Sequence, residues 1–177
     1  WKLPKGLVIS AGGGDVACGG IGIGAVNQKT GFISLGTSAQ VFLGSKKFEP
    51  SPKNLVHSFC HALPETWFDM AALLNGTSVM DAVLRWTSEK NIESLISSAE
   101  QKFQGPGSLL ALPYLSGERT PHNDNQIRGA IVGLSHATVT EDITLAFLES
   151  IAFSLADGLD ALLANNSKPE RLILIGG

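Results

Sequence analysis

The sequence predicts a mixed α/β fold in one domain of 177 residues. Short apolar runs that end at glycines are typical of strands, and longer stretches with apolar residues every three or four positions are typical of helices. The expected strands come both as direct neighbours and separated by helices, which indicates a sheet with antiparallel and parallel pairs. A chain of this length can bury roughly 70% of its unfolded surface, so it needs neither a disulfide nor a metal for stability.

The first third of the chain is predicted to form mainly strands. Residues 15–26 form a helix only if neighbouring segments pack close to its backbone, because each glycine costs a helix about 1 kcal/mol relative to alanine. The turn Gly36-Thr37-Ser38 joins two apolar runs, which is typical of a hairpin. We expect strands over residues 7–10, 32–35, 39–43 and 57–61.

The rest of the chain is predicted to alternate helices with short strands. Asn91 is a good N-cap, and Gly105-Pro106-Gly107 ends the helix that follows it. Residues 113–128 form a long polar loop, and such connections in compact domains are usually functional or disordered. We expect helices over 68–86, 91–103 and 140–164, and strands over 109–112, 130–134 and 171–175, the first and last of them buried.

The composition argues against several classes of function. The 13 Lys and Arg against 16 Asp and Glu give a formal charge of −3, whereas a dedicated nucleic-acid binder is normally basic. No run of roughly 18 apolar residues occurs, so we expect no membrane span. The two cysteines, Cys18 and Cys60, fit no disulfide framework, and the expected location is the cytoplasm.

Glycine is the most informative residue type in the chain. The 20 glycines make up about 11% of the residues, against roughly 7% on average. Clustered glycines mark turns, or backbone that approaches another group closely, and that group is often phosphate. The clusters are Gly12-Gly13-Gly14, the glycines at 19, 20, 22 and 24, Gly36, Gly76 and Gly176-Gly177.

Asp15 follows a glycine-rich segment at the expected start of a helix. Unpaired N–H groups at such a place stabilise an anion. A carboxylate there can also accept the proton of a substrate hydroxyl as that hydroxyl attacks phosphorus. The alternative is that Asp15 only caps the helix, since Asp is among the best N-caps. The two roles are compatible.

The segment Ser34-Leu35-Gly36-Thr37-Ser38 is a second candidate site. A hairpin tip with backbone N–H groups and two hydroxyls suits the oxygens of a nucleotide phosphate. It is no Walker A loop, because Gly-x-x-x-x-Gly-Lys occurs nowhere in the chain. An ordinary turn would have the same sequence, so this alternative stays open.

Two further groups of residues have an alternative structural explanation. Glu118 and Arg119 can hold their loop through ion pairs, or they can contact a ligand or a neighbouring domain. His57, Cys60 and His61 offer three metal-ligating side chains within five residues. On a strand, however, the two histidines share one face while the cysteine points away, so we expect no metal site here.

With these residues in view, the chain resembles the C-terminal domain of the FGGY carbohydrate kinases over almost all of residues 1–177. The segment LPYLSGERTPHND is far more specific than any single glycine pattern. The segments that carry the resemblance are 12–26 (GGGDVACGGIGIGAV), 34–38 (SLGTS), 57–64 (HSFCHALP), 112–124 (LPYLSGERTPHND), 128–136 (RGAIVGLSH) and 145–160 (LAFLESIAFSLADGLD).

The resemblance implies an actin-like fold, in which two domains of ribonuclease-H-like topology close over ATP and a sugar. It implies that Asp15 is the catalytic base, which takes the proton of the sugar hydroxyl. The residues that match the family's nucleotide-binding positions are Gly36 and Thr37 at the ATP phosphates, Gly76 near the nucleotide, and Gly176 and Gly177 at the start of the adenosine loop.

For the intact parent enzyme, the resemblance implies ATP-dependent phosphorylation of a ketopentose such as D-xylulose. The carboxylate associated with Mg²⁺ and most sugar contacts are expected from an N-terminal domain outside this chain. The chain alone lacks half of the cleft, so we expect negligible kinase activity from it. Because a strand that leads into two glycines normally continues into a helix, the domain is also expected to be incomplete after Gly177.

One departure from the family pattern leaves the substrate open. Ketopentose kinases of this family commonly carry Asn directly after the catalytic Asp, where this chain has Val16. The alternatives are a kinase for another sugar or polyol, a non-catalytic relative, or an actin-like nucleotide-binding module without sugar kinase activity. The apolar stripe of the helix over 140–164 can serve either the core or a homodimer interface.

Overall fold

The structure is a computed structural model that describes residues 2–165 and 168–176. Within this part of the chain, five strands form a mixed sheet in the order β3-β4-β2-β1-β7. β7 runs parallel to β1, and the other neighbouring strands are antiparallel. The predicted mixed α/β fold is therefore confirmed. The strands are β1 (Thr30–Leu35), β2 (Ala39–Ser45), β3 (His57–Cys60), β4 (Trp67–Leu73) and β7 (Arg171–Gly176).

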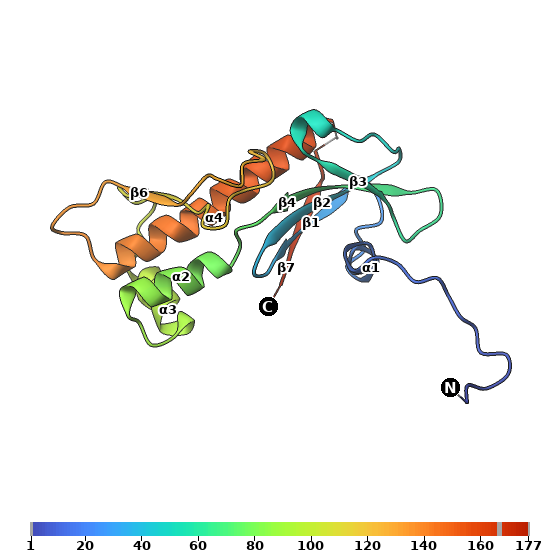
Figure 1. Ribbon diagram of the computed structural model, residues 1–177, viewed down its shortest axis with the longest axis horizontal. Coiled ribbons are helices and arrows are strands. Elements are labelled where there is room, and N and C mark those ends of the chain that lie inside the picture. Colours follow the sequence, from blue (N-terminus) through green and yellow to red (C-terminus); the bar gives the residue numbers. More distant parts are fainter. Residues whose placement is uncertain (1, 166–167, 177) are drawn as a thin grey trace.

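Helices lie on both faces of the sheet, as Figure 1 shows. The helices are α1 (Asp15–Gly22), α2 (Ser78–Thr87), α3 (Ile92–Lys102) and α4 (Thr140–Leu163), with a short 3₁₀ turn at Pro52–Asn54. A separate two-stranded sheet of β5 (Leu110–Leu112) and β6 (Ala130–Val132) lies beside α4. The fold thus has a sheet between two helical layers, with α2 and α3 packed together against α4.

The alternation of side chains along the strands divides the core between the two faces of the sheet. On the α1 face, Phe42 stacks between Phe32 and Phe68, with ring centroids 4.5 and 4.7 Å apart. On the α4 face, Val41 and its alternating neighbours pack against the C-terminal part of α4, around the fully buried Leu162. Both helices are therefore held by apolar contacts, which position the N-terminus of α1 over the sheet.

The capping of α3 agrees with the sequence. The Asn91 side chain accepts a hydrogen bond of 2.8 Å from the backbone N–H of Ser94, one of the N–H groups that a helix start leaves unpaired. We expect Asn91→Ala to lower the free energy of unfolding by about 1 kcal/mol, since an alanine leaves that donor without a cap. Urea unfolding of the purified chain measures this change, with the exposed Ser97→Ala in the middle of α3 as the control.

The predicted helix over 68–86 is wrong in its first half. Residues 67–73 form β4, which lies between β3 and β2, and helix α2 begins only at Ser78. β4 is buried on both faces, with Phe68 towards α1 and Leu73 towards α4. A strand buried on both faces lacks the alternation of apolar and polar residues, so periodicity does not separate β4 (WFDMAAL) from a helix. Gly76 consequently lies in the connection between β4 and α2 and not inside a helix.

Three other expectations about strands need correction. No strand forms over 7–10: this segment is extended and Val8 is 88% exposed, because no described segment pairs with it. The strands β5 and β7 exist, but they are not buried, and Leu110 and Leu174 are each 65% exposed. Within the described residues each of these two strands has one pairing neighbour and one covered face, so half of its side chains face outwards.

Helix α4 agrees with its predicted range to within one residue. The buried side chains of its apolar stripe, including Phe147, Ile151 and Leu162, pack in the core of this chain. The stripe therefore serves the core, and a homodimer stays a prediction. None of the described helices combines the length and the hydropathy that crossing a membrane requires.

Candidate functional site

Asp15 lies at the start of α1 with its side chain exposed. Gly14 is the N-cap and Asp15 is the first helical residue. The explanation of Asp15 as an N-cap is therefore wrong. Its Oδ1 accepts a hydrogen bond of 2.8 Å from the backbone N–H of Val16, which fixes the carboxylate at the helix start.

Helix α1 lies very close to the sheet, as the glycine pattern predicts. A Cβ on Gly20 would come within 3.3 Å of the Phe42 ring and 3.4 Å of the His61 Nε2 atom. A larger residue would hold the helix further from the sheet. The close contact with the sheet thus explains why position 20 of the helix is a glycine. Gly19 and Gly22 face open space, so this explanation does not apply to them.

The β1–β2 hairpin tip docks onto the start of α2. The backbone carbonyl of Gly36 accepts from the N–H of Thr77 at 2.7 Å, and that of Thr37 accepts from the N–H of Gly76 at 3.1 Å and from the Ser78 hydroxyl at 2.8 Å. The N–H groups at the start of α2 therefore bind the hairpin, which leaves the tip itself to face outwards. The N–H groups of Thr37 and Ser38 donate to no acceptor among the described residues.

Gly76 is required for this docking. A Cβ on Gly76 would lie 2.7 Å from both the carbonyl carbon and the carbonyl oxygen of Ser38. Only a residue without a side chain lets the two turns approach so closely. The two predicted site residues Gly36 and Gly76 are thus brought into contact, 40 positions apart in the sequence.

Gly176 lies next to the same hairpin. It ends β7 opposite Leu35, with a φ of +149° that favours glycine, and a Cβ would overlap the carbonyl oxygen of Leu35. A hollow of about 290 Å³ opens here, between Leu35, Thr77 and the end of β7. The remaining predicted residue, Gly177, lies outside the described residues.

Two hollows flank Asp15 on the α1 face of the sheet. The larger, of about 520 Å³, extends over β3 and β4, and the smaller, of about 170 Å³, extends over β1 and β7. Both are lined by Asp15, Val16 and Gln40. The smaller hollow also shares Ile175 with the hollow beside the hairpin tip. The carboxylate and the glycine turns therefore lie along one wall, at the carboxyl ends of β1 and β7, where open α/β sheets bind ligands.

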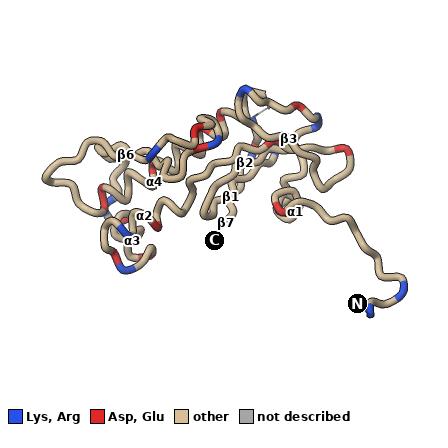
Figure 2. Tube along the Cα trace, viewed as in Figure 1, with Lys and Arg blue, Asp and Glu red and all other residues tan. Residues whose placement is uncertain are grey.

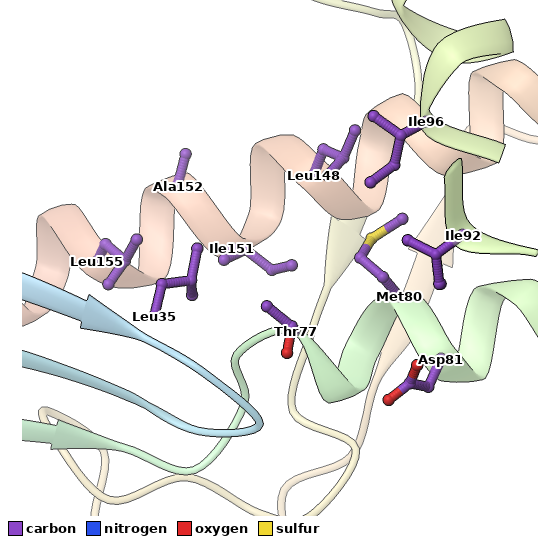
Figure 3. A pocket seen from close by; sticks show the side chains of 10 residues that line it. All are labelled: Leu35, Thr77, Met80, Asp81, Ile92, Ile96, Leu148, Ile151, Ala152 and Leu155. Carbon is purple, nitrogen blue, oxygen red and sulfur yellow. The ribbon is translucent and has the colours of Figure 1, made fainter. Parts of the chain in front are cut away.

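A mainly apolar hollow of about 500 Å³ lies on the other side of the hairpin tip. Figure 3 shows its lining side chains, which come from α2 and its N-cap Thr77, from α3 and α4, and from Leu35 of β1. Thr77 lies where this hollow meets the hollow beside Gly176. A flat apolar group attached to phosphates at the tip has space here.

Charged side chains are scarce along this wall. In Figure 2 the hairpin of β1 and β2 carries neither blue nor red, and α1 carries red. Asp15 and Asp81 are the charged residues that line the four hollows around the tip and α1, and no Lys or Arg lines them. Polyphosphate bound here would be contacted by neutral N–H and hydroxyl groups.

The loop at 113–124 is held by a buried carboxylate and not by an ion pair. Glu118 is 2% exposed. Its Oε1 accepts from the N–H groups of Leu74 at 2.7 Å and Arg119 at 2.8 Å, and its Oε2 accepts from the Asn75 side chain at 3.0 Å. Glu118 therefore binds the loop to the turn that carries Gly76, and the side chain of Arg119 is exposed.

We expect Glu118→Ala to lower the free energy of unfolding by about 2–4 kcal/mol. The substitution leaves the backbone N–H of Leu74 and the Asn75 side-chain N–H that faces Glu118 without an acceptor. Each such group costs about 1–3 kcal/mol. Urea unfolding of the chain measures the loss. The exposed Glu93→Ala on α3 is the control, and a loss below 1 kcal/mol for Glu118→Ala would contradict the structural role.

Tyr114 and His122 of the same loop contact each other. The Tyr114 hydroxyl lies 2.8 Å from the Nε2 atom of His122. Burial raises the pKa of this hydroxyl above its usual value of 10.0, and the negative charges of Asp157 and Glu118 raise it further. Tyr114 thus stays neutral and acts as a structural hydrogen-bonding group.

The histidines of 57–61 contribute to packing. His57 stacks on Phe59, and His61 is buried with its ring edge against Phe42 and Phe68. The described residues bring no three His, Cys, Asp or Glu side chains into a metal-binding arrangement.

Gln40 is a site residue that was not predicted from the sequence, and it lies at the wall beside Asp15. Its position in β2, two residues after Ser38 and with its side chain on the α1 face, follows from the hairpin register. The alternation from Phe42 could have identified it.

Comparison with known proteins shows the same family from sequence and from structure. Xylulose kinases of Escherichia coli (strain K12) and Klebsiella pneumoniae are 42% and 41% identical to this chain over 169 and 177 residues. These alignments cover 96% and 100% of this chain but 35% and 36% of the two relatives. The chain thus spans about a third of the length of the curated relatives that it matches.

Solved structures match to a similar extent. A structure described as a xyloylose kinase from Brucella ovis superposes with a TM-score of 0.90 at 39% identity, over 95% of this chain and 34% of that one. The xylulose kinase from Bifidobacterium adolescentis gives a TM-score of 0.82 at 28% identity, over 94% and 32%. The predicted actin-like fold of a sugar kinase domain is therefore confirmed. Because the model of the C-terminal domain of the FGGY family of carbohydrate kinases also matches residues 31–177, the chain belongs to that family.

Proposed function

We propose that residues 1–177 belong to the C-terminal domain of a longer kinase that transfers the terminal phosphoryl group of ATP to a ketopentose, converting D-xylulose to D-xylulose 5-phosphate. The observation that carries this proposal is the position of the exposed Asp15 carboxylate. It lines two hollows, and the smaller of them adjoins the hollow beside the docked hairpin tip. The similarity to xylulose kinases supports the choice of sugar.

In the proposed reaction, the free oxygen of the Asp15 carboxylate accepts the proton of the terminal sugar hydroxyl. The hydroxyl oxygen forms a bond to the terminal phosphorus of ATP while the bond from that phosphorus to ADP breaks. The exposed N–H groups of Thr37 and Ser38 contact the phosphate oxygens. The backbone at Gly76 lies near the nucleotide, and Gly176 lies near the adenosine, beside Thr77 of the apolar hollow. Gly177 is proposed, from the resemblance alone, to continue the adenosine loop.

The other half of the site comes from outside this chain in our proposal. ATP enters with Mg²⁺, which offsets phosphate charge, and the Asp15 carboxylate alone offers too few ligands to hold the ion. An N-terminal domain, which the greater length of the relatives suggests, supplies the further carboxylate and most sugar contacts. Free sugar and ATP as substrates fit a cytoplasmic enzyme.

The test is sugar-dependent release of ADP by the full-length protein. We expect turnover with ATP and D-xylulose, and negligible turnover from residues 1–177 alone because half of the cleft is missing. If other ketoses or polyols are phosphorylated in preference to D-xylulose, the proposed substrate is wrong but the proposed phosphoryl transfer stands. ATP binding without turnover of any sugar would instead indicate a nucleotide-binding module or a non-catalytic relative.

A further inference from the structure

The face of the sheet beneath α1 changes from apolar to polar at one row of residues. Directly paired residues of neighbouring strands point to the same face of a sheet. The row beneath α1 is entirely apolar, and across β7, β1, β2 and β4 it reads Ile173, Phe32, Phe42 and Met70. The next row on this face, towards the hairpin tip, contains two polar residues and reads Ile175, Ser34, Gln40 and Ala72.

Gln40 stands at the centre of this polar row. Its neighbours on either side, Ser34 and Ala72, have short side chains, so space remains over the sheet beside it. That space corresponds to the hollows of about 520 and 170 Å³, and Gln40 lines both of them together with Asp15 and Val16. The backbone of Gln40 is held between β1 and β4, which makes its position rigid.

The carboxamide of Gln40 is available to bind a ligand by hydrogen bonds. The residue is half-buried, and no described residue forms a hydrogen bond with its side chain. A carboxamide offers one acceptor oxygen and two N–H donors, which match a hydroxyl that both donates and accepts. Val16, the other side chain that lines both hollows beside Asp15, is apolar and offers no such bond.

We propose that Gln40 is a specificity-determining residue, whose carboxamide hydrogen-bonds the sugar hydroxyl on the carbon next to the phosphorylated one. This inference rests on the sugar kinase function proposed above. Asp15 contacts the reacting hydroxyl, and Gln40 lines the same hollows, so it meets the neighbouring hydroxyl of the same molecule. For a ketopentose phosphorylated at O5, the neighbouring hydroxyl is the one at C4.

The test compares kcat/KM of the full-length enzyme for D-xylulose and for its C4 epimer, L-ribulose. Gln40→Leu keeps the size of the side chain but removes its polar atoms. We expect it to lower kcat/KM for D-xylulose about tenfold, to change kcat/KM for L-ribulose little, and to leave the KM for ATP unchanged. Gln101→Leu, an exposed substitution on α3, is the matched control and is expected to leave the preference between the sugars unaltered.

Each other outcome overturns the inference in a recognisable way. If the ratio of the two kcat/KM values in Gln40→Leu stays within about twofold of the wild-type ratio, Gln40 forms no hydrogen bond that distinguishes the C4 hydroxyl. Equal losses on both sugars with a lower unfolding temperature would give Gln40 a structural role only. If the wild-type protein phosphorylates no sugar at all, the proposed function fails, and the role of Gln40 fails with it.

Discussion

Replacing Asp15 with Asn in the full-length enzyme is expected to lower kcat by about 10²–10⁴-fold, the usual range for losing a general base. Asn has the same shape, and its side-chain oxygen can still accept from the N–H of Val16, as Oδ1 of Asp15 does at 2.8 Å. What it loses is the second carboxylate oxygen, which can take a proton. Steady-state rates of ADP release at saturating ATP and sugar measure the effect.

The KM for ATP distinguishes two explanations of a low kcat in Asp15→Asn, the loss of the catalytic base and damage to the fold. It should change little in Asp15→Asn, because the hairpin tip and the start of α2 bind each other without Asp15. Asp160→Asn, an exposed substitution on α4, is the control and should keep full activity. Activity of Asp15→Asn within about tenfold of the wild type would refute the assignment of the base.

Gly76→Ala is expected to destabilise the chain by about 1–3 kcal/mol and to raise the KM for ATP. The added Cβ would lie 2.7 Å from the carbonyl group of Ser38, and this neighbour is backbone, so the hairpin tip must move away from α2. The movement would break the hydrogen bonds from Gly76 and Thr77 to the tip and shift the N–H groups of Thr37 and Ser38.

Two measurements test the role of Gly76. Urea unfolding of the chain gives the stability loss, and ATP dependence in the full-length enzyme gives the change in KM. Gly107→Ala is the matched control, because a Cβ at Gly107 would find its nearest neighbour 3.9 Å away. Unchanged stability and KM in Gly76→Ala would mean that the two turns can separate without cost, contrary to our interpretation.

The features that the sequence predicted well are those decided by local interactions. The hairpin forms because a short glycine turn joins two apolar runs, and its register pairs Leu35 with Ala39. The N-cap of α3 likewise depends on the bond from Ser94 to Asn91, three residues apart. Such contacts are visible in a few consecutive letters of the sequence.

The features that the sequence did not predict depend on segments far apart in the chain. Glu118 accepts from the N–H of Leu74, 44 residues away, and nothing in the loop sequence distinguishes this buried acceptor from a partner of Arg119. The alternation along β2 puts Gln40 on the face of Phe42, but only the packing of α1 over that face brings Asp15 beside it. β4 was missed because both of its faces are buried, and only the sheet order reveals that.

The close contact of Gly20 with the ring of Phe42 has a consequence for the rate of the proposed reaction. Asp15 and Gly20 belong to one short helix and lie about 7.5 Å apart along its axis. The distance between the helix and Phe42 therefore also sets how far the Asp15 carboxylate stands from the sheet. A single added methyl group at position 20 would therefore shift the proton acceptor relative to the phosphate without touching either reactant. Natural variation of turnover among such enzymes can thus arise at packing positions that no substrate reaches.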